Sequence, residues 1–160
     1  MKKIILLSVC LCASLILKAQ PTTDEIGLIQ SAYGMEKRAI VEKYMKLTDA
    51  EAAGFWKVYE TYEAARKELG KKRVNTIVDY ANNYANLTDA KAADLVKQAM
   101  SFQMSIAKLQ QSTFSKMSKV ISPKRAAQFI QLEGYLETVI RLSISNEIPF
   151  IGELDDLRKN

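Results

Sequence analysis

Side chains that commonly carry out catalysis or bind metal ions are scarce in this chain of 160 residues. It contains no histidine, and its two cysteines, Cys10 and Cys12, both lie in an apolar stretch near the N-terminus. A Ser–His or Cys–His relay therefore cannot form, and zinc sites made from His or Cys are excluded. The Glu-x-x-His motifs of di-iron bundles are excluded too, and no Glu/Asp pair stands in an apolar context. We therefore expect that the protein is not an enzyme and has no catalytic residue, no cofactor and no metal ion.

The remaining side chains suited to a function are apolar ones, which act by contact. One predicted helix carries more large apolar residues within two turns than a single neighbouring helix can cover. Met100 and Met104 fall beside the main apolar stripe of the next predicted helix, and a surface methionine adapts to varied partners. The alternative is that both methionines are core residues against another helix or a second subunit. We assign a client or dimer surface to Phe55, Trp56, Tyr59, Tyr62, Met100 and Met104.

The N-terminal segment is typical of a secretory signal peptide, which we place at residues 1–19. Lys2 and Lys3 precede an apolar run that is too short for a stable membrane span, and Ala19 offers a small residue for cleavage. Cleavage removes both cysteines and predicts a periplasmic or secreted protein of the bacterial envelope without disulfide bonds. It also removes three of the 23 basic residues, so 20 basic residues face 18 acidic ones. This near balance argues against nucleic acid as a partner, because nucleic-acid binding needs a basic face.

A repeated motif marks the expected starts of the helices. Leu47-Thr48-Asp49-Ala50 recurs as Leu87-Thr88-Asp89-Ala90, and a degenerate third copy begins at Ile121-Ser122-Pro123. Threonine and serine hydroxyls accept hydrogen bonds from the N–H groups that are free in the first turn of a helix. Glu51 completes a capping box with Thr48. The helix-cap motif consists of Leu47, Thr48, Leu87, Thr88 and Ser122.

Apolar residues recur at helical spacing along the rest of the chain and predict an all-α fold. Four helices are expected: Thr23 to Tyr44, Asp49 to Tyr84, Asp89 to Ser118, and Pro123 to the residue before Pro149. The second and third are joined only by Ala85, Asn86 and Leu87 and the cap residue Thr88, so they form a long antiparallel helical hairpin with the other two as flanking helices. Their apolar stripes match in register: Ile77 meets Leu95, Leu69 meets Phe102, Tyr62 meets Leu109, and Phe55 meets Met117. In the last helix either Val139 or Ile140 continues the stripe. We place one domain at residues 20–148 and a C-terminal tail at 149–160.

The signal peptide, the long antiparallel helices and two LT-x-x-polar motifs resemble the Spy/CpxP-like, LTxxQ group of bacterial periplasmic proteins. The resemblance covers Leu47 to about Ile144, and Glu51 and Lys91 stand where the family pattern has Gln. It implies an all-helical, often dimeric, cradle-shaped envelope-stress protein. Some members of the group are ATP-independent chaperones and some inhibit sensor kinases. Distant relatives sense metals through His-rich sites, which this chain lacks.

Three functional classes follow for this chain. The first is a chaperone that shields unfolded envelope proteins, the second a regulatory adaptor or inhibitor that binds an envelope sensor, and the third a structural helical protein without a client. We expect a homodimer. The predicted register also gathers a basic patch at one end of the bundle, which is either a solvated helix end or an attraction for a partner or membrane surface. Its residues are Lys43, Lys46, Lys116, Lys119, Lys124 and Arg125.

Overall fold

The computed structural model describes residues 36–149 and residue 151, and the regular structure of these residues is entirely helical. A helical segment covers residues 36–45. It is followed by α2 (Asp49–Asn83), a short 3-10 helix η1 (Tyr84–Asn86), α3 (Asp89–Met117) and α4 (Pro123–Glu147). The prediction of an all-α, four-helix fold built on a long hairpin is confirmed. The predicted signal peptide, the predicted start of the first helix, and residues 150 and 152–160 of the predicted tail lie outside the described residues.

The helix boundaries lie where the capping residues predict them. Glu51 accepts a hydrogen bond from the Thr48 backbone N–H at 3.0 Å at the start of α2. The hydroxyl of Thr88 accepts from the Lys91 N–H at 3.3 Å, and that of Ser122 from the Arg125 N–H at 3.3 Å. At the other end of α4, Ile148 has an extended conformation with ψ 125°, as expected for a residue before proline.

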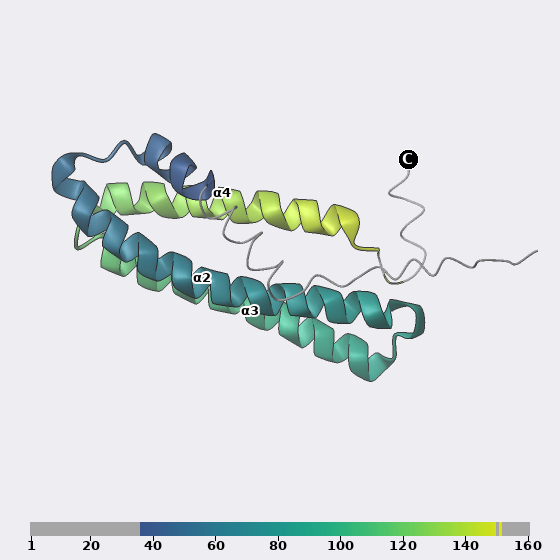
Figure 1. Ribbon diagram of the computed structural model, residues 1–160. Coiled ribbons are helices and arrows are strands. Elements are labelled where there is room, and N and C mark those ends of the chain that lie inside the picture. Colours follow the sequence, from purple (N-terminus) through teal and green to yellow (C-terminus); the bar gives the residue numbers. More distant parts are fainter. Residues whose placement is uncertain (1–35, 150, 152–160) are drawn as a thin grey trace, which may run out of the picture.

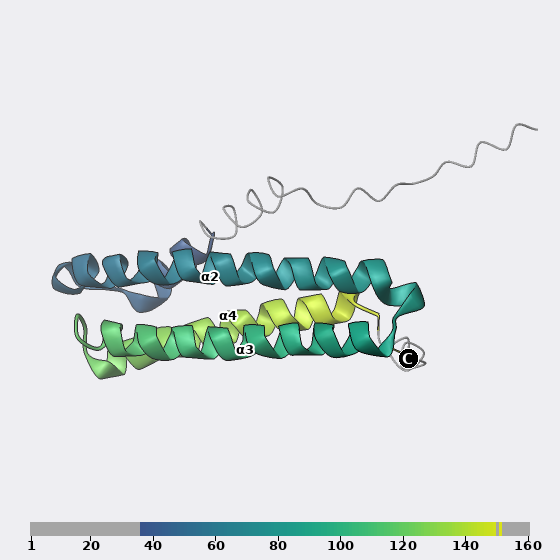
Figure 2. The same cartoon turned by 90° about the horizontal axis from the view of Figure 1, so that it is seen from below.

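Helices α2 and α3 run antiparallel and side by side along their whole length in both views of the molecule (Figures 1 and 2). Asp79 and Lys91 form an ion pair of 2.6 Å near the η1 turn. One residue pair of the predicted register, Leu69 and Phe102, lines a common cavity. The short link and the matched stripes therefore predicted the hairpin correctly.

The hydrophobic core lies at the end of the bundle opposite the η1 turn. Phe129 of α4 packs between three aromatic residues of α2, with ring centroids 5.4 Å from Phe55, 6.0 Å from Tyr59 and 5.7 Å from Tyr62. The helical segment 36–45 closes this core with two further apolar side chains. The core residues are Val41, Met45, Phe55, Tyr59, Tyr62, Met117, Ile121, Ala126, Phe129 and Leu132.

The half of the bundle near the η1 turn is packed more loosely. In the part of α3 between the η1 turn and the middle of the helix, the buried apolar residues are Leu95 and Ile106. In α4, Ile140 is half-buried while Val139 is 47% exposed, so Ile140 is the residue that continues the stripe. Within the described residues no helix is both long and apolar enough to cross a membrane.

Candidate functional site

A cluster of charged side chains lies inside the apolar core, where three helical elements meet. Lys37 from the segment 36–45 is 1% exposed and donates hydrogen bonds to Glu63 of α2 and Glu133 of α4. Glu133 is 2% exposed and also accepts from the Tyr62 hydroxyl at 2.6 Å. Glu63 in turn accepts from Arg66 Nε at 3.0 Å. We call these five residues the buried ion cluster.

The two carboxylates of the buried ion cluster differ in their proton affinity. Burial raises the pKa of Glu133 above its ordinary value of 4.5, although Lys37 and the Tyr62 hydroxyl favour the ionised form. Burial acts on Glu63 in the same direction, but Arg66 and Lys37 outweigh it and hold the pKa of Glu63 below the ordinary value. Burial also raises the pKa of Tyr62, which keeps that hydroxyl a neutral donor.

The buried ion cluster is built to hold helices together and has no room for a substrate. The cavity beside it measures about 10 Å³, which is at most the space of one water molecule. Glu133 Oε1 and the Tyr59 hydroxyl are buried without a hydrogen-bond partner among the described residues. A single water molecule could donate a hydrogen bond to Glu133 Oε1. The cluster therefore cross-links the segment 36–45, α2 and α4.

The expectation that no carboxylate pair stands in an apolar context was wrong. Glu63 and Glu133 are far apart in the sequence, so no local pattern joins them. The three buried charged residues of the cluster each lie four positions from a core residue: Lys37 before Val41, Glu63 after Tyr59, and Glu133 after Phe129. Three helical elements each carry a charged residue at a position where the apolar stripe predicts a core residue, and this pattern is the sequence signal that indicates the cluster.

The aromatic residues assigned to a client or dimer surface belong to the core instead. Phe55, Tyr59 and Tyr62 are at most 3% exposed, so this part of the assignment is corrected. Trp56 is half-buried, and the Arg38 guanidinium lies 4.0 Å from its ring centroid. Phe129 of α4 covers the apolar surface that was expected to be in excess.

The two methionines are exposed. Met100 is 59% and Met104 58% exposed, and Val96, one turn before them, is 51% exposed. These residues recur every four positions on α3 and form one face, which we call the α3 apolar strip. The alternative of a methionine core against α4 does not hold. A second exposed face on α4 consists of Tyr135, Val139 and Leu142.

The predicted basic patch loses one of its members. Arg125 donates to the Met45 carbonyl at 2.6 Å and to Glu51 Oε1 at 3.2 Å, and so fastens the start of α4 to the end of the segment 36–45 and to the first turn of α2. The Thr48 backbone N–H and Arg125 together hold the pKa of Glu51 below its ordinary value. The other five patch residues are exposed, near the end of the segment 36–45 and around the turn from α3 to α4: Lys43, Lys46, Lys116, Lys119 and Lys124.

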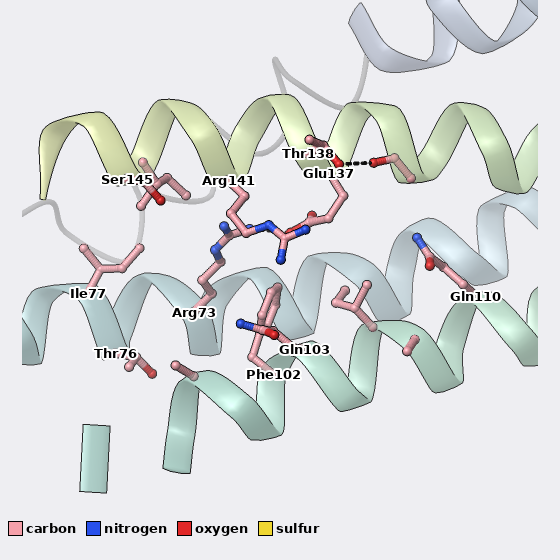
Figure 3. A pocket seen from close by; sticks show the side chains of 15 residues that line it. Arg73, Thr76, Ile77, Phe102, Gln103, Gln110, Glu137, Thr138, Arg141 and Ser145 are labelled. Carbon is pink, nitrogen blue, oxygen red and sulfur yellow. Dashed lines mark hydrogen bonds and ion pairs between the residues drawn. The ribbon is translucent and has the colours of Figure 1, made fainter. Parts of the chain in front are cut away.

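A groove of about 580 Å³ runs between α4 and the α2–α3 hairpin. Figure 3 shows Arg73 of α2 and Arg141 of α4 reaching into it from opposite sides, with Phe102 of α3 on its floor. Sequence reasoning assigned none of these residues to a site, because they come from three helices and share no motif. No group of three or more Asp, Glu, Cys or His side chains comes together in residues 36–149 as a metal-binding cluster.

Comparison of this chain with known protein families, with curated proteins and with solved structures finds no match. The resemblance to the Spy/CpxP-like group therefore stays a prediction that rests on the residues quoted for it.

Proposed function

We propose that this protein is an exported envelope protein that acts by surface contact, as a Spy-like, ATP-independent chaperone for unfolded proteins. The observation that carries the proposal is the α3 apolar strip, Val96, Met100 and Met104, whose side chains are more than half exposed. Flexible thioether side chains pack against many different apolar sequences. Large apolar residues gathered on one face of a monomer mark an interaction site.

The arrangement of the bundle supports contact with an extended partner. The α3 apolar strip lies on a helix of 29 residues and covers about two of its turns, which gives a narrow surface along the helix. Exposed lysines flank the strip, among them Lys97 and Lys108, and they keep such a surface soluble. We include in the proposal that two chains associate, because the second exposed face on α4 offers a separate surface for a partner subunit.

An aggregation assay tests the chaperone. A reduced, denatured client is diluted into buffer with the chain that begins at Gln20, and light scattering follows the aggregation. We expect the parent protein to suppress scattering and the double variant Met100→Ser, Met104→Ser to lose most of that suppression. The matched control, Met100→Leu with Met104→Leu, keeps the apolar character and is expected to retain it.

The helical content of all three proteins is compared by circular dichroism, and it should be the same because the side chains are exposed. Suppression that is equal in the serine variant and its parent would remove the α3 apolar strip from the proposal. If the parent protein does not suppress aggregation, the chaperone proposal is refuted.

A regulatory adaptor for an envelope sensor is the second candidate, and the five exposed lysines of the basic patch favour it. Such a concentration of one charge attracts acidic partners and speeds their association. Changing Lys116, Lys119 and Lys124 to Glu should abolish capture of a sensor from envelope extracts if the adaptor is right. The same change should leave suppression of client aggregation intact if the chaperone is right.

A further inference from the structure

The charges in the groove between α4 and the hairpin do not balance. Three charged residues line it, Arg73, Glu137 and Arg141. Arg73 donates to Glu137 Oε1 at 2.8 Å, and its guanidinium lies 5.0 Å from the ring centroid of Phe102. Arg141 has no hydrogen bond or ion pair with any residue in the described part of the chain. One guanidinium therefore points into the groove without an ion-pair partner among the described residues (Figure 3).

A second cavity of about 240 Å³ adjoins the groove towards the η1 turn. The two share Thr76, Ile77 and Ala99 in their linings. Tyr80, the polar residue of its far wall, uses its hydroxyl to donate to the Pro149 carbonyl at 2.8 Å. The rest of that wall is apolar: Leu87, Ala92, Leu95, Val96, Ile148 and Ile151.

The groove supplies a charged section and the adjoining cavity supplies an apolar section, and the two sections are continuous. The groove alone has the size of an ordinary small-molecule site, about 300–1,000 Å³. A ligand that fits both sections has an anionic head and an apolar chain. A guanidinium binds a carboxylate through two parallel hydrogen bonds, and the apolar section would take the chain out of water.

We propose that this groove binds a single-chain carboxylate amphiphile, with its head at Arg141 and its chain in the apolar cavity towards the η1 turn. The site shares Val96 with the α3 apolar strip, but Met100 and Met104 line neither cavity. It also goes beyond the proposed function, since its ligand is a small molecule. The pair Arg73–Glu137 is already neutral and positions the groove walls on either side of the head.

The test is titration calorimetry of the chain from Gln20 with dodecanoate, kept below its micelle-forming concentration. We expect one dodecanoate to bind per chain, and Arg141→Gln to weaken it about tenfold through the lost charged hydrogen bonds. The control Lys108→Gln removes a positive charge from an exposed position of α3 outside both cavities. It should change the affinity by less than about twofold, as expected for a charge that is screened by salt.

Two further arms separate the head from the chain of the ligand. Acetate, which has the head alone, should not compete with dodecanoate, and dodecyltrimethylammonium, which has the opposite charge, should not bind. Ala99→Phe places a ring where the two cavities adjoin and should weaken dodecanoate without lowering the melting temperature, because Ala99 is exposed.

The proposal is overturned if dodecanoate does not bind, or if Arg141→Gln binds it as the parent does. It is also overturned if the cationic amphiphile binds equally well, because the groove would then be an unselective apolar surface. A melting temperature of Arg141→Gln equal to that of the parent shows that the loss of affinity is not a loss of fold.

Discussion

Replacing Lys37 by methionine removes the centre of the buried ion cluster while keeping a side chain of similar length. Lys37 is 1% exposed and contacts both Glu63 and Glu133. Loss of one partner of a buried ion pair costs about 3–5 kcal/mol, because the other charge stays buried without compensation. Glu63 keeps Arg66 at 3.0 Å, whereas among the described residues Glu133 keeps only the neutral Tyr62 hydroxyl. We therefore expect a loss at the lower end of the range, about 3 kcal/mol at pH 7.

The loss should depend on pH, since Glu133 can escape the penalty by taking up a proton. Burial already raises the pKa of Glu133 in the parent protein, and removing Lys37 raises it further. A carboxyl group whose pKa is higher in the folded than in the unfolded state destabilises the fold at pH values above both. The variant should therefore recover stability relative to the parent as the pH is lowered from 7 towards the ordinary carboxyl value of 4.5.

Urea denaturation of Lys37→Met and its parent at pH 7 and pH 5 measures this. The control Lys43→Met makes the same replacement at an exposed position of the same helical segment, and it should stay within about 0.5 kcal/mol of the parent. Adding Glu133→Gln to Lys37→Met should restore about 1–3 kcal/mol, because the orphaned charge is gone. A loss below about 1 kcal/mol, or one that is the same at both pH values, would refute the reasoning.

Four further substitutions test the packing and the helix starts. Thr88→Ala should lower the free energy of unfolding by about 1 kcal/mol through loss of the cap on α3, and a loss of client binding with an unchanged melting curve would make the motif a binding site. Gly54→Ala should destabilise the protein by about 1–3 kcal/mol by overpacking, because its added Cβ would lie 3.0 Å from Val120 Cβ. Gly134→Ala should stabilise it by about 0.5–1 kcal/mol, since no atom of the described residues lies within 4 Å of the added Cβ. If both glycine variants change the stability in the same direction, the packing described around them is contradicted. Arg125→Gln should lower the melting temperature, because the Arg125 guanidinium fastens α4 to the Met45 carbonyl at the end of the segment 36–45. An unchanged melting temperature would indicate that Arg125 is a free surface charge of the basic patch.

The helices and the hairpin could be predicted from the sequence because their determinants are local. A hydroxyl residue before each helix and a proline after the last one decide the boundaries within a few residues of chain. The hairpin register follows from two apolar stripes and a short link, so Leu69 and Phe102 had to meet once the link was identified. The same local reasoning identified Met100 and Met104 as lying beside the main stripe of α3, and they are exposed.

The buried ion cluster and the aromatic core could not be predicted in this way, because they depend on contacts between distant parts of the chain. Counting the aromatic residues of one helix suggested an uncovered surface, but Phe129 comes from about seventy residues further along the chain and covers it. Lys37 and Glu133 are separated by 96 residues. The residues next to Lys37 or Glu133 in the sequence do not show which opposite charge forms an ion pair with it.

Binding of unfolded proteins to the α3 apolar strip is the central claim, and methionine methyl resonances test it most directly. The protein is labelled with ¹³C-methyl methionine and titrated with a reduced, permanently unfolded client, while two-dimensional spectra follow each methyl group. Met100 and Met104 are exposed, whereas Met45 and Met117 are 0% exposed and serve as internal controls. We expect the signals of Met100 and Met104 to shift or broaden as client is added and those of Met45 and Met117 to stay unchanged. Unchanged signals from Met100 and Met104 with a client that binds would contradict the account, as would changes confined to the two buried methionines.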